Sequence, residues 1–152
     1  MTEHLKIEGE DKIIVRFAEE YDKANPQTIV DMCHSLYRKH WNTLFYVDGA
    51  NRGAVNLMKV VFDESLDWDT NHVSPELMKI IPVNFTTEHK QMLSHLHVMI
   101  NKGYLAIPSK YEKLITSLRT ADAREYSLDK EQTSYSDSLD ALRLSLKGYN
   151  IK

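Results

Sequence analysis

The sequence of 152 residues predicts an α/β fold with a mostly parallel central sheet. Short apolar, β-branched segments alternate with longer segments in which apolar residues recur every three or four positions. This alternation is typical of parallel strands that are connected by crossover helices. The length and the hydrophobic fraction of 42% suit one buried core, so we expect a single domain over residues 1–152.

Several short segments are predicted as strands. The first two form a hairpin across a turn at residues 9–11, and Pro82 predicts an edge or a bulge in a later strand because proline cannot donate to a ladder. The segments are residues 5–7, 12–17, 43–47, 80–85 and 104–107.

Helix signals lie between these strands. Asn25 and Pro26 predict an N-cap and a first helical position, and Gly103 predicts a helix end. Residues 109–112 match a capping box, whereas residues 63–76 are predicted as an acidic loop. Apolar stripes place the helices at residues 26–40, 54–61, 92–102 and 111–118, with a last one from residue 134 or 136 to Gly148.

The composition excludes several classes of protein. The single cysteine, Cys33, rules out a disulfide within the chain and lies on an apolar helical stripe, where we expect a buried hydrophobe. No apolar run is long enough for a membrane span, so a cytoplasmic location without membrane association is expected. Zinc is not expected, because ligand spacing is absent at His89, His95 and His97.

The net charge of −3 argues against general coating of nucleic acid. The charges are nevertheless segregated along the chain. Residues 60–76 carry five acids and no base, whereas residues 89–119 carry five Lys or Arg residues and one acid. Binding of DNA by one part of the surface is therefore not excluded by the net charge.

Asp48 is the first candidate functional carboxylate. It follows the apolar residues 44–47 and precedes a turn with glycines at positions 49 and 53. Ligands in open α/β sheets bind outside the carboxyl ends of the strands, which places Asp48 at the functional edge. The alternative is a turn aspartate that accepts hydrogen bonds from nearby amides.

Asp137 and Asp140 are the second candidate. Three residues apart, they project from one face of the first turns of the last helix. Ordinary capping of the helix start is the alternative. If Asp48 and Asp137 face each other, their repulsion requires a cation between them, with Asp140 at the margin. An oxygen-rich site of this kind selects Mg²⁺ or Mn²⁺.

Four segments together resemble the C-terminal nuclease domain of viral terminase large subunits, the motors that package viral DNA. The segments are FYVDGAN at residues 45–51, IPVNF at 81–85, NKGYLAI at 101–107 and DSLDAL at 137–142. Their order and spacing match from about residue 12 to residue 150. The resemblance implies an RNase H-like three-layer fold and a DNA endonuclease that depends on Mg²⁺ or Mn²⁺.

The resemblance implies a role for each aspartate. Asp48 takes the second ligand position and Asp137 the third, while Asp140 matches a closing aspartate that supports the site or acts as a secondary ligand. The family's His-Asp-Asp is replaced here by Tyr135, Ser136 and Asp137. The first acidic strand is missing, because no apolar strand ending in aspartate precedes residue 12. We therefore expect a nuclease fragment or shortened descendant with weak or no activity alone.

The resemblance also implies partners. These are double-stranded DNA, the terminase ATPase domain, the small terminase subunit and the portal. The residues expected to contact DNA are Lys90, Lys102, Lys110, Lys113 and Arg119, with ordinary solvated charges as the alternative. Other readings of the whole chain are an RNase H-like enzyme of the resolvase or integrase type and a non-catalytic α/β interaction module.

The missing strand leaves two arrangements of the sheet open. Residues 12–17 pair directly with residues 43–47, or the gap exposes strand edges that a second copy of the chain fills. The second arrangement is favoured and predicts a homodimer in which residues 5–7 or 12–17 pair or exchange between chains.

Overall fold

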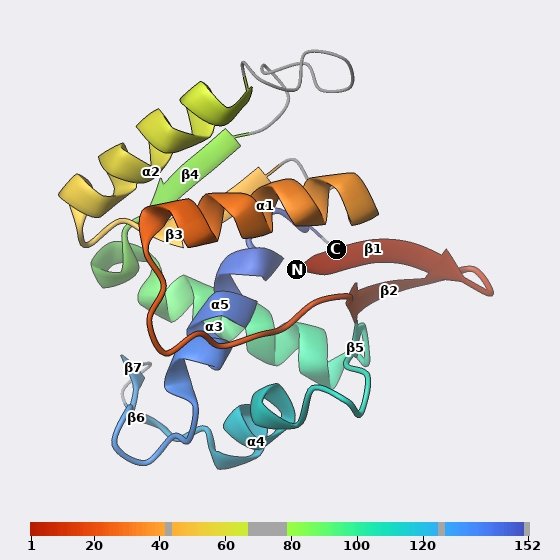
Figure 1. The fold of residues 1–152 in the computed structure, drawn as a ribbon. Coiled ribbons are helices and arrows are strands. Elements are labelled where there is room, and N and C mark those ends of the chain that lie inside the picture. Colours follow the sequence, from red (N-terminus) through yellow and green to blue (C-terminus); the bar gives the residue numbers. More distant parts are fainter. Residues whose placement is uncertain (42–43, 67–78, 125–126, 151–152) are drawn as a thin grey trace. The chain divides into compact units, whose positions relative to one another are not determined.

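The computed structural model describes residues 1–41, 44–66, 79–124 and 127–150. Within these ranges the chain is an α/β protein with five helices and seven short strands, which confirms the predicted class (Figure 1). None of the described helices combines the length and the apolar character needed to cross a membrane.

The chain forms two compact units. Unit 1 contains Met1–Glu20 and Thr86–Lys152, and unit 2 contains Tyr21–Phe85. The described strands belong to three sheets, two in unit 1 and one in unit 2. The described residues therefore do not form the single, mostly parallel sheet that was predicted.

The mixed sheet of unit 1 begins with the predicted hairpin. Strands β1 (Thr2–Ile7) and β2 (Glu10–Val15) pair antiparallel, and both turn residues, Glu8 and Gly9, have positive φ. Strand β5 (Leu105–Ala106) lies parallel to β2 on its other side (Figure 1). Because β2 has a neighbour on each side, it does not pair with residues 43–47, and that predicted arrangement is wrong.

Three helices complete the core of unit 1. They are α3 (Phe85–Asn101), α4 (Glu112–Thr120) and α5 (Ser136–Leu146). Gly103 has φ of +66°, a conformation that glycine adopts without strain, and it ends α3 as predicted. Buried side chains from all three helices, β2 and β7 (Ser127–Leu128) form one cluster of Ile13, Val15, Leu96, Met99, Leu114, Leu128, Leu139, Leu142 and Leu146.

The start of α4 differs from the prediction. The helix begins at Glu112 with Tyr111 as N-cap and no side-chain capping bond, so the capping box at residues 109–112 is wrong. The Tyr111 amide donates instead to the Pro108 carbonyl at 3.1 Å, which closes a turn before the helix. A small hairpin that was not predicted, β6 (Ala123–Arg124) with β7, follows α4.

Unit 2 is built from two helices and a parallel strand pair. Helix α1 (Pro26–His40) starts as predicted, because the Asn25 side chain accepts a hydrogen bond from the Thr28 amide at 2.8 Å. Cys33 of this helix is buried, and burial raises the pKa of its thiol to about 12, which confirms its role as a buried apolar residue.

The parallel pair consists of β3 (Leu44–Asp48) and β4 (Lys79–Val83). Their first residues lie beside each other, and so do their last, Asp48 and Val83. Helix α2 (Arg52–Leu66) lies between them in the sequence. The predicted acidic loop is therefore wrong for residues 63–66, and residues 67–76 lie outside the described residues. Among the described strands, β4 pairs only with β3, which agrees with the edge predicted from Pro82.

Candidate functional site

Asp48 is the last residue of β3 and its side chain is exposed. Its Oδ1 accepts a hydrogen bond from the Ala50 amide at 2.9 Å, so the aspartate stabilises the turn that follows the strand. For Oδ2 the described residues contain no hydrogen-bond donor within reach. Asp48 thus acts as a turn residue and still offers carboxylate lone pairs to solvent.

The turn after Asp48 is held against the end of β4. The Gly49 amide donates to the Val83 carbonyl at 2.8 Å, and a Cβ on residue 49 would lie 3.1 Å from that oxygen. Such an approach is tighter than most Cβ contacts, so glycine fits this position best. Asp48 pairs in register with Val83, so Asn84 follows at the same carboxyl edge of the parallel pair.

Asp137 lies in the first turn of α5 and is exposed. The neighbouring Ser138 donates its hydroxyl hydrogen to Glu20 at 2.9 Å, while Tyr135 occupies the N-cap position with φ of +51° and no side-chain capping bond. Asp137 therefore presents a carboxylate to solvent beside an unusual helix start.

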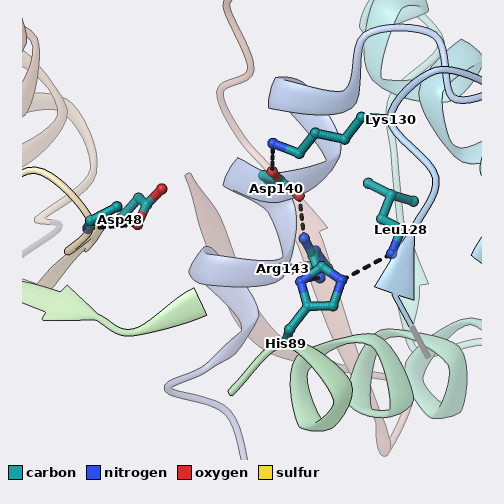
Figure 2. A network of polar contacts seen from close by, with 7 residues as sticks. Asp48, His89, Leu128, Lys130, Asp140 and Arg143 are labelled. Atoms are coloured by element: carbon teal, nitrogen blue, oxygen red, sulfur yellow. Dashed lines mark hydrogen bonds and ion pairs between the residues drawn. The ribbon is translucent and has the colours of Figure 1, made fainter. Parts of the chain in front are cut away.

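Asp140 has very different surroundings. One carboxylate oxygen bonds Nη2 of Arg143, and the other lies 3.0 Å from Nζ of Lys130 (Figure 2). The Asp140 side chain is only 14% exposed and that of Arg143 is 0% exposed, whereas that of Lys130 is 59% exposed. Both oxygens of Asp140 are thus engaged by cationic groups.

His89 of α3 joins this network. Its Nε2 accepts a hydrogen bond from the Leu128 amide at 2.9 Å, and its Nδ1 lies 3.2 Å from Nη1 of Arg143 (Figure 2). Burial lowers the pKa of His89, and the adjacent Arg143 charge lowers it further. The network of His89, Leu128, Lys130, Asp140 and Arg143, named here the Arg143 network, connects α3, α5 and the β6–β7 hairpin.

The Arg143 network bears on the metal prediction. A divalent ion at Asp140 would have to displace Lys130 and lie close to the Arg143 charge, which does not fit ligation. Among the described residues no group of three His, Cys, Asp or Glu side chains is arranged to hold a metal ion. Asp48 belongs to unit 2 and Asp137 to unit 1, so a cation shared by these two carboxylates stays a prediction.

The five residues predicted to contact DNA all belong to unit 1. Lys90 lies on α3, Lys102 just after it, and Lys113 and Arg119 in the first and last turns of α4, with Lys110 just before that helix. Three of the lysines lie over tyrosine rings: Lys102 over Tyr104, Lys110 over Tyr111 and Lys113 over Tyr135.

Of the Arg143 network, only Asp140 was predicted from the sequence as a site residue. Arg143 follows Asp140 by three positions, a spacing at which opposite charges meet on a helix, so the pair was visible in the sequence. His89 and Lys130 carried no such signal, because His89 is 54 positions from Arg143 and tertiary packing brings them together.

Comparison with known proteins gives no match to a family model, to a curated protein or to a solved structure. The resemblance to terminase nuclease domains thus stands on the four sequence segments given above.

Proposed function

We propose that the chain is a metal-dependent DNA endonuclease domain of the terminase large-subunit type, with an RNase H-like fold and weak activity alone. The observation that carries this proposal is the placement of Asp48. It is an exposed carboxylate at the carboxyl end of a parallel strand pair, on a turn that Gly49 holds against β4. Ligands of open α/β sheets bind at such ends.

Asp48 and Asp137 would hold the metal ion in this proposal. Both are exposed oxygen donors, the ligand type that Mg²⁺ and Mn²⁺ prefer. The ion would neutralise charge on the scissile phosphate and promote ionisation of an attacking water. Asp140 has a supporting role, because its ion pairs with Arg143 and Lys130 hold the start of α5 in place.

Weak activity is expected because the resemblance supplies only the second and third acidic ligands, Asp48 and Asp137. Three of the four acids of the first hairpin already have a basic partner. Glu3 bonds Arg16 at 2.6 Å, Glu10 lies 3.2 Å from Lys12, and Asp11 lies 2.8 Å from His4. The proposed substrate is double-stranded DNA in the host cytoplasm, and the proposed partners are the terminase ATPase domain, small subunit and portal.

The test is nicking of supercoiled plasmid with Mn²⁺ or Mg²⁺. We expect slow nicking that stops on chelation and falls to background in Asp48→Asn and Asp137→Asn, because asparagine keeps the shape but removes the charge that attracts the cation. Asp31→Asn is the matched control, since Asp31 is an exposed aspartate of α1 that bonds only Gln27 in the described structure. Nicking that resists chelation, or full activity in both variants, contradicts the proposal.

A non-catalytic interaction module is the second candidate, favoured by the Arg143 network. Two cationic groups already compensate Asp140, so this part of the site is stable without a metal. The two candidates differ in Mn²⁺ binding. An endonuclease domain predicts paramagnetic broadening of the backbone resonances of Gly49 and Ser138, whereas the module predicts none.

A further inference from the structure

Two lysines lie against tyrosine rings where α4 packs on α5 in unit 1. Nζ of Lys113 is 5.6 Å from the ring centroid of Tyr135, and Nζ of Lys110 is 5.1 Å from that of Tyr111. Cation–π contacts of this kind orient an ammonium group without neutralising its charge. Two positive charges therefore lie at the start of α4, and that of Lys113 lies over a ring at the start of α5.

Ion pairs distinguish three other lysines of unit 1 from Lys110 and Lys113. Lys12 pairs with Glu10, Lys130 with Asp140 and Lys147 with Glu88. In the part of the chain that the structure describes, neither Lys110 nor Lys113 has a carboxylate within ion-pair distance. Their ammonium groups are available to an anionic ligand such as phosphate.

Tyr135 is unusual at its position. Its backbone is left-handed, with φ of +51°, a conformation that bulky L residues rarely adopt and that glycine and asparagine tolerate better. The residue is 44% exposed, and its side chain does not cap α5. Neither burial nor capping explains an aromatic side chain here. Residues held in sparsely populated backbone conformations cluster at ligand-binding sites.

We propose that Lys110, Lys113 and Tyr135 form a binding site for single-stranded nucleic acid. One base stacks on the Tyr135 ring, and the two ammonium groups contact the flanking phosphates. Proteins bind single strands without sequence preference by this combination of basic groups and aromatic stacking. The inference rests on the proposed function, because Tyr135 precedes Asp137 by two residues and holds an unpaired strand beside that carboxylate.

The test measures fluorescence anisotropy of a labelled oligodeoxythymidine and of a duplex of equal length, with chelator present so that no cleavage occurs. Tyr135→Asn removes the ring and leaves a residue that suits the left-handed backbone, so folding is preserved. We expect it to weaken single-strand binding about 5- to 150-fold, the range for loss of one stacked base, with little change for the duplex.

Three further variants sharpen the test. Tyr135→Phe keeps the ring and is expected to bind like the unmodified chain. Lys113→Gln is expected to weaken binding and lower its salt dependence by about one phosphate contact. Lys39→Gln, which removes an exposed lysine of α1 in unit 2, controls for net charge and is expected to have no effect.

The outcomes separate this inference from the endonuclease proposal. Unchanged single-strand binding in Tyr135→Asn, or equal loss for single strand and duplex, overturns the inference even if cleavage depends on Asp48. Single-strand binding that depends on Tyr135, in a chain that never nicks DNA, supports the site and overturns the endonuclease.

Discussion

The carboxyl end of β3 and the first half of α5 each carry an aspartate whose position suggests metal binding, yet the two carboxylates differ in their surroundings. Asp48 is exposed and uses one oxygen for a backbone amide. Asp140 is 14% exposed, and both of its oxygens contact cationic groups. A carboxylate with open lone pairs can take up a cation, whereas one that is already neutralised contributes to the fold. The difference supports the proposed ligand role of Asp48 and gives Asp140 a structural role.

The largest effect that tests this comparison is expected from Arg143→Met. The substitution keeps most of the side-chain volume but leaves Asp140 without its buried partner. Breaking one side of a buried ion pair typically costs about 3–5 kcal/mol, so we expect a loss of that size in the free energy of unfolding measured with urea.

Lys130→Met is the matched control for Arg143→Met. The Lys130 side chain is 59% exposed, and exposed ion pairs contribute less than about 1 kcal/mol. Equal effects of the two substitutions would show that Asp140 does not depend on the buried guanidinium, and would remove the structural role assigned to it.

The second prediction exchanges the two aspartates for asparagine. Asp140→Asn removes the negative partner of the buried Arg143 charge but keeps an oxygen that can accept its hydrogen bond, so we expect unfolding to become easier by about 1–3 kcal/mol. Asp48→Asn keeps an oxygen that can accept from the Ala50 amide on an exposed turn, so we expect a change below about 0.5 kcal/mol. Thermal unfolding of both variants checks this. A large loss of stability in Asp48→Asn would show that Asp48 has mainly a structural role.

Much of the local structure could be predicted from the sequence, because its signals involve neighbouring residues. Asn25 before Pro26 caps α1, Gly103 ends α3, and the apolar run before Asp48 forms β3. The capping box at residues 109–112 failed although its letters match, because residues 108–111 form a turn and the helix begins only at Glu112.

Pairing between distant segments could not be predicted in the same way. Periodicity identifies β2 as a strand but does not select β5 as its parallel neighbour over β3. The two-residue strands β6 and β7 are too short to show alternation. The exposed position of Asp48 could be predicted because the residue lies at the end of a strand. The neutralisation of Asp140 depends on Lys130 and Arg143. Of these two, only Arg143 lies three positions from Asp140 on the same helix, so only this contact could be predicted.

His89 gives the Arg143 network a sensitivity to pH. Its two ring nitrogens both face donors, the Leu128 amide and the Arg143 guanidinium. A neutral imidazole can accept one hydrogen bond, but an imidazolium can accept none. Burial and the Arg143 charge accordingly lower the pKa of His89 in the folded chain. Protonation thus favours the unfolded state, in which a histidine has its ordinary pKa of about 6.5.

The smallest predicted effect follows from this direction. The contribution of His89 to stability is fully present above pH about 6.5 and is lost as the pH falls towards the lowered pKa of the folded state, because the unfolded chain binds a proton that the folded chain does not. We expect His89→Gln to flatten this part of the pH dependence in urea unfolding, since glutamine can accept from the Leu128 amide without titrating. His97→Gln, at an exposed position of the same helix, is the control and is expected to retain the wild-type profile. Stability that rises as the pH falls through this window, or an equal flattening in both variants, would mean that protonated His89 is compatible with Arg143 beside it and that the network tolerates a second positive charge.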